Sequence, residues 1–322
     1  MAEYINIKGQ NIEVVASDPA NPTIGQIWYN STSNTLKAFD LTTSGSFSTI
    51  PSLNSPRGNM AVGGAGDATA GLAYGGWPAP NTALAESYDG STWTTENNMT
   101  QGGHIGAGFG TQTAAVKASG SITPSPGYLL TTEEYNGTSW TTSGNTTYAA
   151  TYLAGAGIES AGLMAGGADT GAYNNNSAEY NGSTWTSGNS VPNVLNYHSG
   201  CGTQTAALMG ASQATTPQQF FEYDGTSWTS TANLGSSVYS RVLAGIQTSA
   251  IYWSAGNSPN PFFSKTYDGS TWSTGPDALF SNQYGAGSGQ SAAGYGAFGV
   301  ASTNAQEFNA PGLPQTRTIT AS

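Results

Sequence analysis

The chain has 322 residues, of which only 8% are charged, and its formal net charge at pH 7 is −11. With seven Lys plus Arg against eighteen Asp plus Glu, no basic surface is available to neutralise phosphates, so we expect no nucleic-acid partner. The 44 glycines accompany 11% aromatic residues, and aromatic residues at regular intervals favour many short, packed strands over disorder.

The N-terminal segment, residues 1–35, precedes every repeat in the chain. Its first ten residues, MAEYINIKGQ, include charged and polar residues where a secretory signal peptide needs an apolar run. No run of eighteen apolar residues occurs anywhere in the sequence, so we expect no membrane insertion. We predict that residues 1–35 anchor the chain to another protein.

A seven-residue phrase recurs five times along the chain. Its copies are SYDGSTW (87–93), EYNGTSW (134–140), EYNGSTW (179–185), EYDGTSW (222–228) and TYDGSTW (266–272). Their tryptophans, Trp93, Trp140, Trp185, Trp228 and Trp272, are 47, 45, 43 and 44 residues apart. A period of about 40 to 50 residues is typical of propeller blades and of solenoids.

A second block, rich in glycine and alanine, occurs six times, at 61–76, 105–120, 152–167, 197–212, 240–256 and 284–299. Each block predicts two short strands joined by a tight turn. Each phrase predicts two more strands joined by Asp-Gly or Asn-Gly, where we expect positive φ at both turn residues. Four strands per period without helical periodicity predict an all-β fold, a β-propeller of four-stranded blades.

The residue types also predict where each strand lies. Small residues suit the innermost strands, because side-chain volume is limited near the axis. The Trp and Tyr of each phrase are expected on outer strands, where large rings fill the wedge between neighbouring blades. Stacking on a sugar is the alternative role for these rings.

The two ends of the repeat array complement each other. The segment AQEFNA (305–310) matches the first half of the phrase and stops before its Trp, while LKAFDLTTSGSFSTIPSL (36–53) resembles a phrase with Phe47 in place of the Trp. We therefore expect an N-terminal strand to complete the last blade of a six-bladed propeller over residues 36–309. Seven blades remain open if residues 1–50 form their own blade. The C-terminal tail, 310–322, could pair with a partner.

Several motifs resemble a known group of proteins. The pairs Gly75-Gly76 and Gly166-Gly167, followed by the Tyr and Trp of each phrase, resemble kelch repeats, although such pairs are missing in several blades. The string GTQTAA (110–115 and 202–207) with EYNGTSW is similar to kelch-like repeats of marine bacteriophage virion proteins, especially those of cyanophages. SDPANPTIGQIWYNSTSNTLKAF (17–39) is similar to modules of phage fibre and tail proteins. The resemblance implies a virion protein, tail- or fibre-associated, assembled in the host cytoplasm.

The number and spacing of cysteine and histidine residues give little support for a redox or metal site. A copper site like that of galactose oxidase needs a tyrosine crosslinked to a cysteine and two histidines. The chain has one cysteine, Cys201, and two histidines, His104 and His198, which are two positions out of register in their blocks. We expect a small buried thiol and two histidines in loops or at strand ends, and we expect no metal and no cofactor.

Carboxylates recur in the repeats. We place Glu133, Glu134, Glu179, Glu222 and Glu307 at one repeat position, which spreads them around the rim instead of pairing two at one sugar, as a glycosidase requires. The turn residues Asp89, Asp224 and Asp268 alternate with Asn136 and Asn181, and turn chemistry explains them without a calcium loop. No catalytic residue is expected.

The links on the face opposite the tight turns differ in length and sequence from one repeat to the next. They span 77–85, 121–130, 168–176, 213–220 and 257–263, and they are rich in Pro, Asn and aromatic residues. Loops of this kind suit recognition, with ordinary exposed connectors as the alternative. The predicted contact residues are Trp77, Tyr128, Tyr173 and Phe262.

The predicted function is therefore a non-enzymatic bacteriophage virion protein that mediates host attachment or virion assembly. The expected partners are other virion proteins, bound through the N-terminal segment, and a host surface glycan or receptor; a homo-oligomer is left open. The alternatives are a capsid decoration or cement protein without a host ligand, and a propeller carbohydrate-active enzyme.

Overall fold

The computed structural model describes residues 12–23, 25–41, 45–58, 65–77, 82–122, 127–170, 172–194, 199–210, 219–234, 242–253, 264–280, 286–288, 294–297, 303–309 and 314–319. The chain divides into two compact units, Met1–Ser46 with Ala310–Ser322, and Phe47–Asn309. All regular structure in the described residues is β-strand, so the all-β prediction is confirmed. Accordingly, nothing in that part of the chain is a helix able to cross a membrane.

The larger unit contains six four-stranded sheets built on antiparallel pairs. The first contains β5 (Ala65–Asp67), β6 (Ala70–Tyr74), β7 (Ala85–Tyr88) and β8 (Trp93–Thr95). The second contains β9 (Ala107–Thr111), β10 (Ala114–Ala118), β13 (Thr132–Tyr135) and β14 (Trp140–Ser143). The third contains β15 (Ala154–Ile158), β16 (Ala161–Ala165), β19 (Ser177–Tyr180) and β20 (Trp185–Ser187).

The remaining three sheets repeat this order. The fourth contains β21 (Ser199–Thr203), β22 (Ala206–Gly210), β23 (Phe220–Tyr223) and β24 (Trp228–Ser230). The fifth contains β25 (Val242–Ile246), β26 (Ser249–Trp253), β27 (Ser264–Tyr267) and β28 (Trp272–Thr274). The sixth contains β29 (Ala286–Ser288), β30 (Gly294–Ala297), β31 (Ala305–Asn309) and β4 (Ser46–Ile50). Each Gly/Ala-rich block thus supplies two strands and each phrase two more, as predicted.

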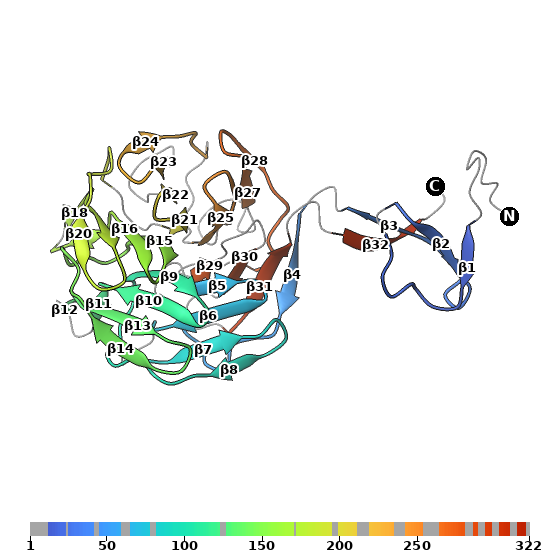
Figure 1. Ribbon diagram of the computed structural model, residues 1–322, viewed down its shortest axis with the longest axis horizontal. Helices are drawn as coiled ribbons and strands as arrows, with labels where there is room; N and C mark the ends of the chain where they lie inside the picture. The colour runs from blue at the N-terminus through green and yellow to red at the C-terminus, as the bar shows by residue number, and fades with distance from the viewer. Residues whose placement is uncertain are drawn as a thin grey trace. The chain divides into compact units, whose positions relative to one another are not determined.

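The sheets adopt a propeller-like arrangement, with the first strand of each sheet nearest the common centre (Figure 1). The glycines of these inner strands permit close approach. A Cβ on Gly155 would lie 2.6 Å from the carbonyl oxygen of Gly108, and one on Gly200 would lie 2.6 Å from that of Gly155. Neighbouring inner strands are therefore too close for side chains at these positions, which confirms the prediction of small residues near the axis.

The tryptophans of the phrases pack between sheets. Trp185 is 8% exposed, and its Nε1 donates a hydrogen bond to Oγ1 of Thr132 on the preceding sheet (2.8 Å). Its ring lies 4.8 Å from that of Tyr180 in the same hairpin and 6.2 Å from that of Phe109 on the preceding sheet. The predicted wedge role is confirmed for this ring, which leaves no face for a sugar.

The N-terminal strand β4 is the outer strand of the sixth sheet. Ser48 donates to Glu307 (2.8 Å) and accepts from Asn309 (2.9 Å), both on β31. Phe47 lies where other sheets place the phrase Trp, with its ring 5.2 Å from that of Phe308. The expected completion of the last sheet by an N-terminal strand is thus present, but it begins at Ser46 and not at residue 36.

The smaller unit is a separate sheet of order β1-β2-β3-β32, made of β1 (Glu13–Val15), β2 (Ile27–Asn30), β3 (Thr35–Leu41) and β32 (Pro314–Ile319). Its first pair is parallel, whereas β3 is antiparallel to β2 and to β32. The larger unit therefore begins at Phe47 and not at residue 36, and the C-terminal tail, expected to be available for a partner, contributes β32 to the smaller unit. The tail pairs with β3. This pairing joins two segments that are far apart in the sequence, and local sequence patterns do not encode which distant strands meet.

Asp18 orders the loop between β1 and β2. Its carboxylate accepts hydrogen bonds from Lys37 (2.6 Å), Asn30 (2.7 Å) and Trp28 (3.1 Å). The hydrogen bond from Lys37, followed by those from Asn30 and Trp28, lowers the pKa of Asp18 to about 2. One exposed carboxylate thereby ties the loop to both β2 and β3.

The Asp-Gly and Asn-Gly turns differ from the prediction in one respect. In all five turns, each of which lies within the described residues, positive φ occurs at the glycine but not at the Asp or Asn. Asp89 instead accepts hydrogen bonds at Oδ1 from the backbone N–H groups of Ser91 (2.8 Å) and Thr92 (2.7 Å). Asp and Asn interchange because both supply this oxygen, and not because both tolerate positive φ.

Candidate functional site

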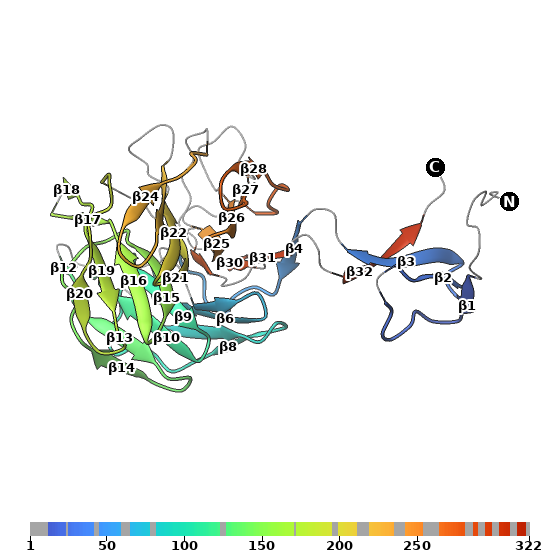
Figure 2. The ribbon, with the colours of Figure 1, turned by 45° about the horizontal axis from the view of Figure 1, so that its top comes forward.

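Two short ribbons extend the links between second and third strands. One consists of β11 (Ser121–Ile122) and β12 (Gly127–Tyr128), and the other of β17 (Ala168–Asp169) and β18 (Ala172–Tyr173). Figure 2 shows β17 and β18 beyond the ends of β16 and β19. Both ribbons lie on the face opposite the tight turns, where sequence analysis places recognition.

The first ribbon gains a third strand from the link that enters the second sheet. His104 and Ser121 exchange two backbone hydrogen bonds of 3.0 Å, and Ser121 lies opposite Tyr128 in the ribbon. Directly opposed residues in antiparallel pairs project to the same face. The side chains of His104, Ser121 and Tyr128 therefore form one row across three adjacent strands.

Trp77 continues this row on the side of the first sheet. Its ring centroid lies 5.9 Å from that of His104 with an interplanar angle of 58°. The contact is fixed by the backbone, because Gly76 donates to the carbonyl oxygen of Gly103 (2.9 Å) and Trp77 exchanges two bonds of 2.7 Å with Gly58. We call Trp77, His104, Ser121 and Tyr128 the aromatic row.

Burial shows which way the aromatic row faces. Its four members are all partly exposed, whereas the alternate positions Gly103, Gly120 and Leu129 are buried. Beneath the row lies Lys117, whose side chain is buried; a Cβ on Gly103 would meet its Nζ at 3.3 Å. The row is thus the solvent side of a three-stranded platform with a packed underside.

The structure brings two of the four predicted contact residues, Trp77 and Tyr128, into this row. Tyr173 occupies the position equivalent to Tyr128 on the second ribbon and is 46% exposed, but its row contains Thr151 and Ala168 in place of His104 and Ser121. Phe262 lies outside the described residues. Tyr173 therefore belongs to a separate row without a second ring.

Sequence reasoning missed His104 and Ser121 as members of the site. His104 was expected in a loop or at a strand end; it lies in the link before β9, forms a bridge to Ser121, and its ring contacts Trp77. Alignment of the blocks could have indicated that these residues lie near each other, since His104 immediately precedes one block and Trp77 immediately follows another. Only the bridge to Ser121 reveals that these positions share a face.

The repeated glutamates join adjacent sheets. Tyr267 donates its hydroxyl hydrogen to Glu222 of the preceding sheet (2.9 Å), and Tyr223 and Tyr180 donate in the same way to Glu179 and Glu134. Burial, together with this carboxylate, raises the pKa of Tyr267 to about 12. These three carboxylates therefore lie at three successive junctions between sheets, and each accepts from a tyrosine of the next sheet.

The predicted set of glutamates occupies two repeat positions, not one. Glu133 lies one residue earlier in its strand than Glu134 and accepts backbone hydrogen bonds from Thr100 (2.7 Å) and Gln101 (3.2 Å) in the link before its sheet. Gln306 does the same for Leu279 (2.8 Å). This earlier position fixes the links, whereas the later one receives the tyrosine.

Two buried cations accompany the link-binding position. Arg57 forms an ion pair of 3.0 Å with Glu86, and both side chains are 1% exposed. Lys117 lies opposite Glu133 in the β10–β13 register. Burial lowers the pKa of Arg57 to about 10 and that of Lys117 to about 8, against the opposing effect of each glutamate. Arg57 and Glu86 thus balance each other's charge inside the fold.

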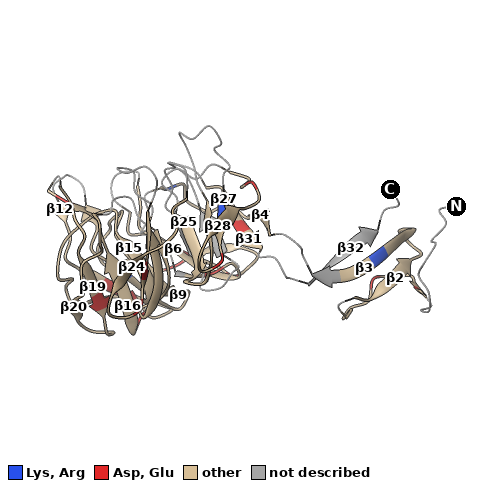
Figure 3. Cartoon of the chain, turned by 90° about the horizontal axis from the view of Figure 1, so that it is seen from above, with Lys and Arg blue, Asp and Glu red and all other residues tan. Residues whose placement is uncertain are grey.

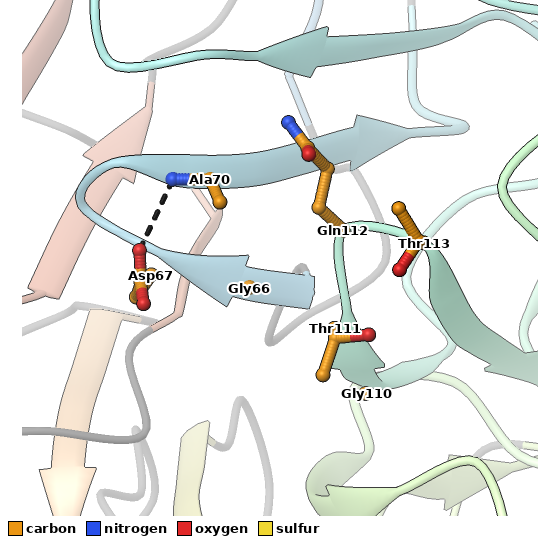
Figure 4. Close-up of a pocket in the computed structure, with 7 residues that line it drawn as sticks. All are labelled: Gly66, Asp67, Ala70, Gly110, Thr111, Gln112 and Thr113. Atoms are coloured by element: carbon orange, nitrogen blue, oxygen red, sulfur yellow. Dashed lines mark hydrogen bonds between the residues drawn. The ribbon is translucent and has the colours of Figure 1, made fainter.

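A shallow pocket of about 210 Å³ opens on the tight-turn face between the first two sheets (Figure 4). Asp67 lines it, but its Oδ1 already accepts from the backbone of Thr69 (2.9 Å) and Ala70 (3.0 Å). The Gln112 amide donates to the Tyr88 carbonyl oxygen (2.6 Å). The polar groups therefore serve turns and sheet junctions, and the pocket offers little for a ligand.

The candidate redox residues do not assemble in the described part of the chain. No group of three or more His, Cys, Asp or Glu side chains there is close enough to hold a metal ion. Cys201 is buried on β21, and burial raises the pKa of its thiol far above the ordinary value. His198 lies outside the described residues. A nucleophilic role for Cys201 thus has no geometric support.

No protein-family model matches the chain. No curated protein matches it either. Among solved structures, the chain is similar to one titled "Structure of YjhT", with a TM-score of 0.62 and 11% sequence identity, covering 84% of this chain and 99% of that one. At this identity the likeness shows the fold alone, and it agrees with the propeller-like arrangement of sheets.

Proposed function

We propose that Phe47–Asn309 is a closed six-bladed β-propeller in which β4 is the outer strand of the last blade. The contacts of β29 support closure, since it touches β25 on one side and β5 on the other. The segment after β4 also supports it. Trp93 Nε1 donates to the carbonyl oxygen of Pro51 (2.9 Å), and the backbone of Asn54 donates to Glu86 (2.7 Å). A strand of the last sheet thus continues directly onto the first.

Truncation tests this closure. One variant lacks residues 1–44 and 310–322 and keeps β4, whereas a second lacks residues 1–53 and 310–322 and loses it. We expect the second variant to lose solubility or to melt at a markedly lower temperature, because β31 becomes an open edge. Equal melting temperatures and monomeric behaviour of both variants would contradict closure by β4.

We further propose that the chain is a non-enzymatic bacteriophage virion protein, tail- or fibre-associated, that mediates host attachment or particle assembly. The recognition role is supported by one contrast. The repeated glutamates are hydrogen-bonded to neighbouring sheets. The aromatic row, on the face opposite the tight turns, presents partly exposed aromatic, imidazole and hydroxyl groups. The resemblance of GTQTAA and EYNGTSW to marine phage repeats supports the virion assignment.

The smaller unit is the proposed link to other virion proteins. It contains the described residues nearest both termini, and its sheet has two edge strands, β1 and β32. Val14 on β1 is 66% exposed. Unpaired edges are templates for strand addition by a partner chain. An immunogold label against this chain on purified particles would test its place in the virion.

Adsorption separates attachment from the alternatives. A variant in which 121–130 and 168–176 are replaced by short Asn-Gly connectors should remain folded and lose adsorption to strains from a panel of marine bacteria. A capsid decoration protein would behave differently: that variant would adsorb normally, and removing the smaller unit would prevent incorporation into particles. Turnover of a polysaccharide by the intact chain, abolished by neutralising one carboxylate, would establish an enzyme and contradict the proposal.

A further inference from the structure

We propose that the aromatic row, Trp77, His104, Ser121 and Tyr128, is a binding site for a neutral oligosaccharide. This inference rests on the proposed recognition function and names its ligand class. A pyranose presents a C–H face and a rim of hydroxyl groups. The row offers rings at both ends, and an imidazole and a hydroxyl between them, which match those two kinds of surface.

The length of the row fits two to three sugar units. His104, Ser121 and Tyr128 lie on three adjacent strands, which are about 4.8 Å apart. Trp77 extends the row by a further ring, 5.9 Å from His104. The backbone bridges of Trp77 and His104 fix the backbone of both residues, and their rings contact each other without a ligand, so little backbone ordering is needed on binding.

The charge of this face selects against anionic sugars. The five links between second and third strands, 77–85, 121–130, 168–176, 213–220 and 257–263, contain one carboxylate, Asp169, and no Lys or Arg. Two cations of the described chain lie beside the row and both are buried: Lys117 is opposite Glu133, and Arg57 is paired with Glu86. Figure 3 shows how sparse charged positions are in the described chain. A uronate or sialate would therefore find no exposed cation at the row and would lose hydration without compensation.

The second ribbon supplies a matched control. Tyr173 is equivalent to Tyr128 and more exposed, but its row has no second ring and no imidazole. Stacking at one isolated ring is weak, whereas two rings with polar groups between them act together. Tyr173→Ala should therefore leave saccharide binding unchanged, although it removes the same side chain from the same kind of ribbon.

The test is calorimetric titration of the full chain with maltotriose, cellotriose, chitotriose and trigalacturonate. We expect at least one neutral trisaccharide to bind, with Kd on the order of 0.1–1 mM, and trigalacturonate not to bind. Trp77→Ala and Tyr128→Ala should each raise Kd about tenfold. Trp77→Phe should retain most of the affinity, and thermal melting curves should show that all variants are folded.

Three outcomes would overturn the inference: equal or tighter binding of trigalacturonate, no effect of Trp77→Ala in a folded protein, or no binding of any neutral trisaccharide. In the last case, if the loop-exchanged variant still loses adsorption to cells, recognition stands and its ligand is not a neutral saccharide. If saccharide binding is found but the loop-exchanged variant still adsorbs to cells, the row is a saccharide site and the attachment function fails.

Discussion

Phe308 and Thr266 occupy the two positions at which three other junctions pair a tyrosine with a glutamate. Phe308 is the fourth residue of β31, as Tyr267 is of β27, and Thr266 is the third residue of β27, as Glu222 is of β23. Where the hydroxyl is missing, its acceptor is missing too. The two changes together avoid a buried polar group without a partner, which supports a structural role for the repeated glutamates.

This relationship predicts coupling between the two positions. Phe308→Tyr alone should lower the free energy of unfolding by about 1–2 kcal/mol, because the added hydroxyl faces threonine in a buried site. Combining it with Thr266→Glu should recover most of that loss. Urea unfolding of both single variants and the double variant gives the coupling energy, and strict additivity would show that the positions do not form a pair.

The buried ion pair of Arg57 and Glu86 lies where the segment after β4 meets the first sheet. Arg57→Met should lower the free energy of unfolding by about 3–5 kcal/mol, because it leaves a buried carboxylate without its cation. Arg57→Met with Glu86→Gln should cost less, since Gln still accepts from Asn54. Arg57→Lys, which keeps the charge, serves as the control. Unfolding in urea measures all three, and equal losses for the single and double changes would contradict this account.

Glu159 stands at the turn position that three other sheets fill with glutamine, Gln112, Gln204 and Gln247. The amides of Gln204 and Gln247 each donate to two carbonyl oxygens of the preceding sheet, at 2.9–3.2 Å. A carboxylate has no proton to donate there unless it is protonated. Burial, and then the nearby charge of Glu134, raise the pKa of Glu159 above its ordinary value of 4.5.

Glu159→Gln should therefore raise the free energy of unfolding by about 1 kcal/mol at pH 7. Because the folded-state pKa is raised, the stability that protonated Glu159 contributes is present below pH 4.5 and is lost as pH rises through the folded-state pKa. The advantage of the variant should thus grow from acid to neutral pH. Melting temperatures measured from pH 4 to pH 8 check this, and a constant difference would refute it.

Ser119 replaces the first glycine of a Gly-Gly pair and has a φ of 57°, against 69° at Gly75 and 71° at Gly166. Its hydroxyl is hydrogen-bonded with the carbonyl oxygens of Leu129 (2.9 Å) and Ala150 (3.0 Å). Ser119→Ala keeps the unfavourable φ and loses these bonds, so it should cost about 2–3 kcal/mol. Ser119→Gly relieves the strain and should cost less. The reverse order in thermal unfolding would mean that strain is negligible.

The tryptophans between sheets differ in burial, so their replacement by alanine should cost different amounts of stability. Trp185→Ala should lower the free energy of unfolding by about 3–5 kcal/mol, as large-to-small changes in a core do. Trp272 is partly exposed, so Trp272→Ala should cost less. Chemical denaturation measures both values. Loss of saccharide binding by Trp185→Ala at unchanged stability would show that this ring is a ligand platform and not core.

The repeats by themselves determined much of this architecture. Four strands per period, hairpins at Asp-Gly and Asn-Gly, small residues on inner strands and tryptophans between sheets follow from local turn chemistry, two-residue alternation and side-chain volume. Each of these acts over a few residues and recurs in every repeat. The outer strand of the last sheet was also predictable, because AQEFNA lacked a partner and the segment around Phe47 lacked a block.

Tertiary structure alone decided what depended on distant partners. Thr35–Leu41 matches part of the repeated phrase, yet it pairs with Pro314–Ile319 in a separate unit. Its hydrogen-bonding partner is set by which distant strand lies beside it in the folded chain, and not by its own sequence. The aromatic row is decided in the same way. Trp77, His104 and Tyr128 come from separate links, and only the backbone bridges of Trp77 to Gly58 and of His104 to Ser121 place their side chains together.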